Sequence, residues 1–73
     1  MSTPRQYSLC RVDISQWPGY QFVSIPFANG DTVIFLGEIP NQPDHCIVWH
    51  VEQERIYAFY HTENFVELTE EEL

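Results

Sequence analysis

Residues 25–36 read Ile-Pro-Phe-Ala-Asn-Gly-Asp-Thr-Val-Ile-Phe-Leu, which places an apolar pair, a turn and an apolar run in direct succession. Asn29, Gly30 and Asp31 are typical of a turn, because asparagine and glycine adopt positive φ at little cost. The run that follows is rich in β-branched and aromatic residues, which favours a strand. This stretch therefore predicts a small, tightly curved β-domain.

The rest of the chain consists of short apolar segments separated by turn-forming residues, a pattern typical of all-β domains. Strands are predicted over residues 7–14, 32–36, 45–51, 56–60 and 65–68. Two prolines and an asparagine predict a loop over 37–44, and residues 61–64 are predicted to form a single 3-10 turn before the last strand. Five short strands without helical periodicity predict an all-β, five-stranded small barrel.

A single domain is expected, because the 73 residues contain neither a repeat nor an internal linker. Residues 1–6 are predicted to be a flexible tail, residues 7–69 the barrel, and residues 70–73 an acidic C-terminal end. Residues 15–29 contain no charged side chain at all. The barrel is therefore expected to carry a long, uncharged first loop.

The charge balance limits the classes of partner. The chain has eleven acidic residues, three arginines and no lysine, which gives a net charge of −8. Such a chain repels nucleic acid and anionic membrane surfaces, so direct binding to either is not expected. A folded protein partner with a basic surface is favoured, although acidity also serves simply to keep a small aromatic-rich domain soluble.

The sequence predicts a cytoplasmic location. No apolar run approaches the ~20 residues that a membrane-spanning helix needs, and residues 1–5 lack the apolar core of a signal peptide. In that compartment Cys10 and Cys46 are predicted to be reduced and buried, not joined in a disulfide.

The order and spacing of three segments resemble SH3 domains. Residues 25–31 resemble the family's Leu-x-Phe-x-x-Gly-Asp segment, and residues 63–68, Glu-Asn-Phe-Val-Glu-Leu, resemble its closing Ser-Asn-Tyr-Val-Glu-Leu. Residues 10–14 are weakly similar to its opening Ala-Leu-Tyr-Asp-Tyr. The resemblance implies an SH3-like fold over nearly the whole chain.

The peptide-binding residues of the SH3 family are mostly absent from this sequence. Val12 and Ile14 occupy the positions of the two opening tyrosines. His45 stands in place of the groove tryptophan, and Thr62 in place of the groove proline. Only Phe65 keeps an aromatic ring at its groove position. Because SH3 domains bind Pro-rich peptides on that groove, the resemblance does not extend to this activity.

Eleven aromatic residues exceed the number of large rings that a barrel core of this size holds. Both faces of the strands predicted over 45–51 and 56–60 are apolar, so some of their rings should be exposed. The candidates are Trp49, Tyr57, Phe59 and Tyr60. The partner-binding patch is predicted to consist of Trp17, Tyr20, Phe22, His45, Trp49 and Phe65. Alternatively, the first loop folds back over the barrel and covers its own rings.

No catalytic residue, metal or other cofactor is predicted. The chain has no recognisable nucleophile motif or glycine-rich phosphate loop, and a filled small barrel leaves little room for a cleft. The thiols and imidazoles lack the paired spacing of zinc sites, and the neighbours His45 and Cys46 point to opposite faces of a strand. The side chains considered are Cys10, His45, Cys46, His50 and His61.

These observations predict a non-catalytic protein-interaction module, or a small accessory subunit. It would dock on a folded, basic protein through the aromatic patch. The alternative is a small acidic inhibitor that mimics nucleic acid and blocks a DNA- or RNA-binding protein. Self-association through Trp49 and its strand is also left open.

Overall fold

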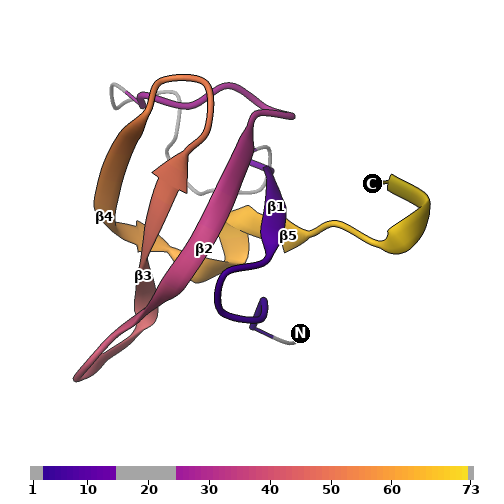
Figure 1. The fold of residues 1–73 in the computed structure, drawn as a ribbon. Coiled ribbons are helices and arrows are strands. Elements are labelled where there is room, and N and C mark those ends of the chain that lie inside the picture. The colour runs from indigo at the N-terminus through magenta and orange to yellow at the C-terminus, as the bar shows by residue number, and fades with distance from the viewer. Residues whose placement is uncertain (1–2, 15–24, 73) are drawn as a thin grey trace.

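A computed structural model describes residues 3–14 and 25–72 of the chain, which form one antiparallel sheet of five strands (Figure 1). The strands are β1 (Leu9–Val12), β2 (Thr32–Ile39), β3 (Gln42–His50), β4 (Arg55–His61) and β5 (Phe65–Glu67). A 3-10 turn, η2 (Thr62–Asn64), precedes β5, and another, η3 (Glu70–Glu72), follows it. The predicted all-β class and the 3-10 turn before the last strand are confirmed. Within the described residues no helix is long and apolar enough to cross a membrane.

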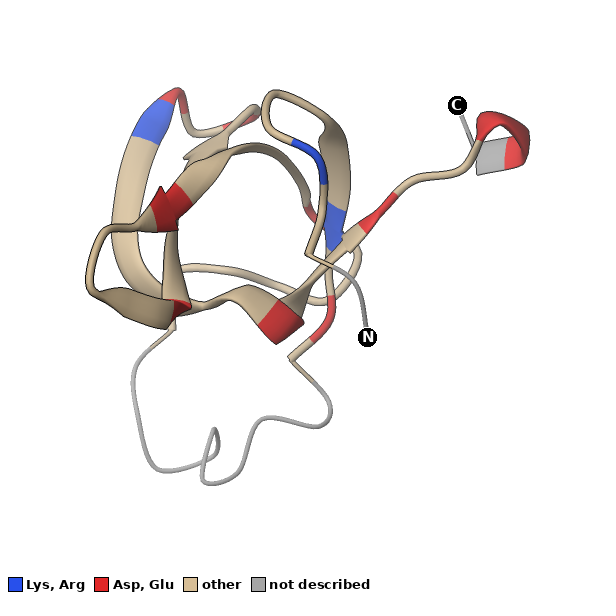
Figure 2. Cartoon of the chain, turned by 90° about the horizontal axis from the view of Figure 1, so that it is seen from below, with Lys and Arg blue, Asp and Glu red and all other residues tan. Residues whose placement is uncertain are grey.

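The strand order is β4-β3-β2-β1-β5, so β4 and β5 are the two end strands of the sheet. The sheet curls around a common core, and η2 carries the chain from one end strand to the other (Figure 2). Among the described residues no ladder joins β4 to β5. The sheet is therefore open at this point, whereas the sequence predicted a barrel.

The connection between β2 and β3 differs from the predicted loop over residues 37–44. Both strands extend into that range, and a two-residue turn, Pro40-Asn41, joins Ile39 to Gln42. Proline presets the φ of the first turn residue, and Asn41 supplies the positive φ of 67° that the second requires. Pro40 and Asn41, which contributed to the prediction of an unpaired loop, thus form the turn of the hairpin.

Extra residues interrupt the ladders on both sides of β3. Leu36 is the extra residue between the pairs Phe35–Val48 and Gly37–Ile47. Phe59 is the extra residue in β4, with a φ of 68° and a side chain that is 61% exposed. Bulges of this kind bend a strand and increase its twist, which helps a short sheet to curl.

The core is built from the inward-facing residues of the curled sheet. Its buried members are Cys10, Val12, Phe27, Val33, Phe35, Cys46, Val48 and Phe65. Phe27 lies at the centre of an aromatic cluster, because its ring makes edge contacts with Tyr57, Tyr60 and Phe65 at centroid distances of 4.9–5.7 Å. Both cysteines are buried and free, as predicted, and burial raises the pKa of the Cys46 thiol to about 11.

Residues 3–6, predicted as part of a flexible tail, contact the sheet. Pro4 is buried. The Arg5 guanidinium lies 2.7 Å from the Glu67 carboxylate, and the Arg5 backbone N–H donates to the same side chain at 2.8 Å. The Gln6 side chain donates to the Leu36 carbonyl at 3.0 Å. The start of the described chain is thereby attached to β5 and β2.

The bulge conformation predicts an unusual substitution pattern at Phe59. A side chain with Cβ costs ~1–2 kcal/mol in left-handed backbone, whereas glycine does not. Phe59→Gly should therefore have a free energy of unfolding ~0.5–1 kcal/mol higher than Phe59→Ala, since both lose the exposed ring and only glycine loses the strain. Urea titration of the two variants measures the difference; an alanine variant of equal or greater stability would contradict the strain.

Candidate functional site

The strand register places one apolar row across four strands on the outer face of the sheet. Leu9 in β1 is opposite Ile34 in β2, Ile34 is opposite Trp49 in β3, and Trp49 is opposite Ile56 in β4. Residues directly opposite each other in antiparallel strands project from the same face. The neighbouring positions Cys10, Val48 and Val33 are buried, so this row faces away from the core.

A second row runs beside the first. Val66 in β5 is opposite Arg11 in β1, and Arg11 is opposite Thr32 in β2. The Val51 N–H donates to the Thr32 carbonyl at 3.2 Å, which places Val51 at the end of this row. The apolar members of the two rows together form the outer apolar face: Leu9, Ile34, Trp49, Val51, Ile56 and Val66.

The outer apolar face is partly open to solvent. Leu9 is 39% exposed and Ile56 is 61% exposed, while Ile34 and Trp49 are half-buried against their neighbours. Four of the six exposed large hydrophobic residues in the described part of the chain belong to this face. Contiguous exposed apolar residues commonly mark sites of interaction.

The carboxylates lie around this face and not within its two rows. In the two rows of the described sheet, Arg11 is the only charged residue and no carboxylate occurs. Glu52 and Glu54 lie in the exposed turn between β3 and β4, next to Val51 and Ile56. Figure 2 shows where the acidic positions fall along the ribbon, with uncharged stretches between them.

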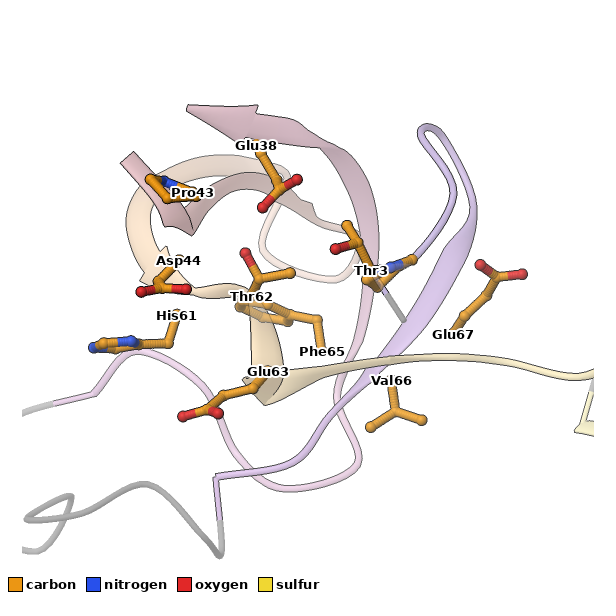
Figure 3. A pocket seen from close by; sticks show the side chains of 11 residues that line it. Thr3, Glu38, Pro43, Asp44, His61, Thr62, Glu63, Phe65, Val66 and Glu67 are labelled. Carbon is orange, nitrogen blue, oxygen red and sulfur yellow. The ribbon is translucent and has the colours of Figure 1, made fainter. Parts of the chain in front are cut away.

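An acidic hollow lies between Glu38, Pro43 and Asp44 of the β2–β3 hairpin and the segment that contains η2 and β5 (Figure 3). Phe65, Val66, Pro4 and Pro43 supply its apolar lining. Its carboxylates come from Glu38, Asp44, Glu63 and Glu67. Hydrogen bonds from the backbone N–H and guanidinium of Arg5 hold the pKa of Glu67 below its ordinary value.

The structure distributes the predicted patch residues over different places. Trp17, Tyr20 and Phe22 lie outside the described residues. Trp49 lies at the middle of the first apolar row. Phe65 is only 3% exposed, packs on Phe27 and is among the residues that line the acidic hollow.

His45 and the four rings predicted to be exposed differ in how far solvent reaches them. His45 is half-buried on β3 beside His61. Of the four rings named as candidates for exposure, Phe59 is exposed, whereas Tyr57 and Tyr60 pack against the core. Sequence reasoning missed Leu9, Ile34 and Ile56 as surface neighbours of Trp49. Each lies in a segment predicted to be a strand, but only the strand register brings them into one row.

A buried hydrogen-bond network fixes the turn that carries Asp31. His50 is 2% exposed, and its Nε2 lies 2.8 Å from Asp31 Oδ2. The backbone N–H of Gln53 donates to His50 Nδ1 at 3.1 Å, so the ring proton is on Nε2 and is donated to Asp31. Asp31 Oδ2 also accepts the Ala28 N–H at 3.0 Å. Both ring nitrogens of His50 are thus engaged within the fold.

The network extends from His50 to the neighbouring segments. The Gln53 side chain donates to the Pro26 carbonyl at 2.8 Å and accepts a hydrogen bond from the Tyr57 hydroxyl. The ring of Phe27 stacks on His50, with an interplanar angle of 7°. Residues 25–31 are therefore held against the β3–β4 turn. No motif in the sequence indicated this role for His50.

Comparison with protein-family models, curated proteins and solved structures found no match. Among the described residues no group of three or more His, Cys, Asp or Glu side chains is arranged to hold a metal ion.

Asp31 should make stability depend on pH in the acid range. Its hydrogen bonds to His50 and to the Ala28 N–H lower its pKa, so ionised Asp31 stabilises the fold above its ordinary pKa. That contribution is lost as the pH falls through the lowered value. Asp31→Asn should cost ~1–3 kcal/mol at pH 7, and its stability should fall less between pH 4 and pH 2 than that of the wild type.

Urea titrations across this pH range measure the effect, with Asp44→Asn as the matched control because Asp44 is exposed in the acidic hollow. The control should keep the wild-type slope. Parallel pH profiles for the wild type and Asp31→Asn would contradict the assigned role of Asp31.

Proposed function

We propose that this chain is a non-catalytic protein-interaction module of SH3-like architecture that docks on a folded protein through the outer apolar face. The partner's contact surface would be apolar at its centre and would carry lysine or arginine side chains around it. The single observation that supports this most is the row Leu9–Ile34–Trp49–Ile56, which crosses four strands in register.

The row has the composition of the centre of a protein interface. Adjacent strands are ~4.8 Å apart, so the four side chains span ~14 Å across a rigid sheet. Tryptophan is enriched among the residues that contribute most to binding, and Trp49 lies between two aliphatic neighbours. Because the side chains stand on paired strands, little conformational entropy is lost when a partner covers them.

The charge distribution specifies the partner further. The face itself carries no carboxylate, while Glu52 and Glu54 lie beside one end of it and the overall charge is −8. An apolar centre with a charged rim is the usual anatomy of a protein interface. We call Glu52 and Glu54 the acidic rim. Its negative charge would attract a basic partner over long range, which raises the association rate more than the affinity.

The two buried, free thiols support a reducing compartment, and we place the protein in the cytoplasm. Mimicry of nucleic acid is less well supported. It needs carboxylates spaced like phosphates along one surface, whereas the two strand rows carry none and the acidic hollow gathers its four carboxylates around a single depression.

The decisive experiment compares Trp49→Ser and Ile56→Ser with Phe59→Ser, since the Phe59 ring is as exposed as Ile56 but belongs to neither row. Once the partner that the wild type retains at high salt is purified, Kd is measured for each variant. We expect at least a tenfold loss of affinity for Trp49→Ser and Ile56→Ser, and less than threefold for Phe59→Ser. Circular dichroism of each variant checks that the fold is retained.

Equal affinities for all three variants would overturn the proposed face. A dimer seen by sedimentation, and lost only in Ile56→Ser and Trp49→Ser, would instead assign the face to a second copy of the chain.

The acidic rim gives a separate prediction. The double variant Glu52→Gln, Glu54→Gln should lower the association rate with the partner severalfold at low salt, while the dissociation rate changes little. Added salt should reduce the difference, because exposed charges are screened. Stopped-flow measurements at two salt concentrations test this. Complete loss of binding in the double variant would favour the acidic mimic.

A further inference from the structure

Two of the three histidines lie side by side at one end of the sheet. His45 in β3 and His61 in β4 are directly opposite each other in the strand register. Their ring centroids are 4.9 Å apart, and the ring planes are tilted by 36°. The third histidine, His50, is buried and has both nitrogens engaged by Asp31 and Gln53.

We propose that His45 and His61 together bind one divalent transition-metal ion of the class that prefers imidazole, namely Zn²⁺, Ni²⁺ or Cu²⁺. Each histidine supplies one ring nitrogen. Water, or a group from a bound partner, fills the remaining coordination positions. This inference does not rest on the proposed function, because it uses other residues and another ligand.

The separation of the two rings is compatible with coordination of one shared ion. A zinc–nitrogen bond is ~2.0–2.1 Å and a ring nitrogen lies ~1.2 Å from its centroid, so the metal lies ~3.2 Å from each centroid. Two such rings have centroids ~4.5 Å apart at a right angle and ~5.2 Å apart at a tetrahedral angle. The distance between the His45 and His61 centroids, 4.9 Å, falls between these limits.

The surroundings of the pair favour a cation. His61 lines the acidic hollow together with Asp44 and Glu63, and Figure 3 shows the three side chains on the same side of it. Their carboxylates raise the local concentration of cations without being ligands themselves. The pair stands on two hydrogen-bonded strands, so the backbone holds the two imidazoles side by side before an ion binds.

Isothermal titration of the untagged, reduced chain with Ni²⁺ and with Zn²⁺ tests the proposal. We expect one site per chain and at least a tenfold weaker Kd in His45→Gln and in His61→Gln. Glu63→Gln is the matched control, because it removes a neighbouring charge and keeps both imidazoles; its Kd should change less than threefold. Ca²⁺ should not compete, since it binds carboxylates and not imidazole.

A nuclear magnetic resonance spectrum of the histidine ring nitrogens identifies the ligands directly. Zn²⁺ should shift nitrogens of His45 and His61 and leave those of His50 unchanged. Three results would overturn the proposal: no binding, an unchanged Kd in either histidine variant, or equal weakening by Glu63→Gln, which would make the Glu63 carboxylate a ligand and not a neighbouring charge.

Discussion

The hydrogen bond between His50 and Asp31 is the constraint on which the rest of this small domain depends. It joins the end of β3 to the turn before β2, inside a core of few large side chains. Because Nδ1 accepts from Gln53, the same ring also fixes the β3–β4 turn. A buried imidazole without these partners would be costly, so the segments that supply them are held in place. The ring of Phe27 stacks on His50 and connects this hydrogen-bond network to the aromatic centre of the core.

This constraint separates the two faces of the sheet. With Cys46, Val48 and His50 directed inward, the alternate residues of β3 must face outward, and Trp49 is among them. The same alternation along β1, β2 and β4 assembles an apolar row whose members come from four separate segments. The acidic residues are left to the turns and to the hollow near η2. The interior network and the candidate docking face are thus two consequences of one strand orientation.

Much of the fold follows from the sequence, and the site follows from it only in part. Short apolar runs bounded by turn residues predict β3 and β4, and the apolar pair, turn and run over 25–36 predict the start of β2. The hairpin at Pro40-Asn41 was mistaken for a loop, because proline and asparagine disfavour strands but also form tight turns. Trp49 was identified from its ring alone. Leu9, Ile34 and Ile56 could not be, since register depends on pairing between distant segments, and the engagement of His50 likewise depends on tertiary contacts.

The pairing of β1 with β5 has a consequence for the connectivity of the chain. Cys10 is opposite Glu67 and Val12 is opposite Phe65, so the first and last strands of the sheet are neighbours. The tight turn at Pro40-Asn41 lies at an exposed tip, away from that junction (Figure 1). A circular permutant that joins the two ends of this 73-residue chain and opens the backbone at this tip would keep every strand in its present ladder. Its β1 and β5 would then be linked locally, whereas the pairing of β2 with β3, now a tight hairpin, would become the long-range contact that folding has to close.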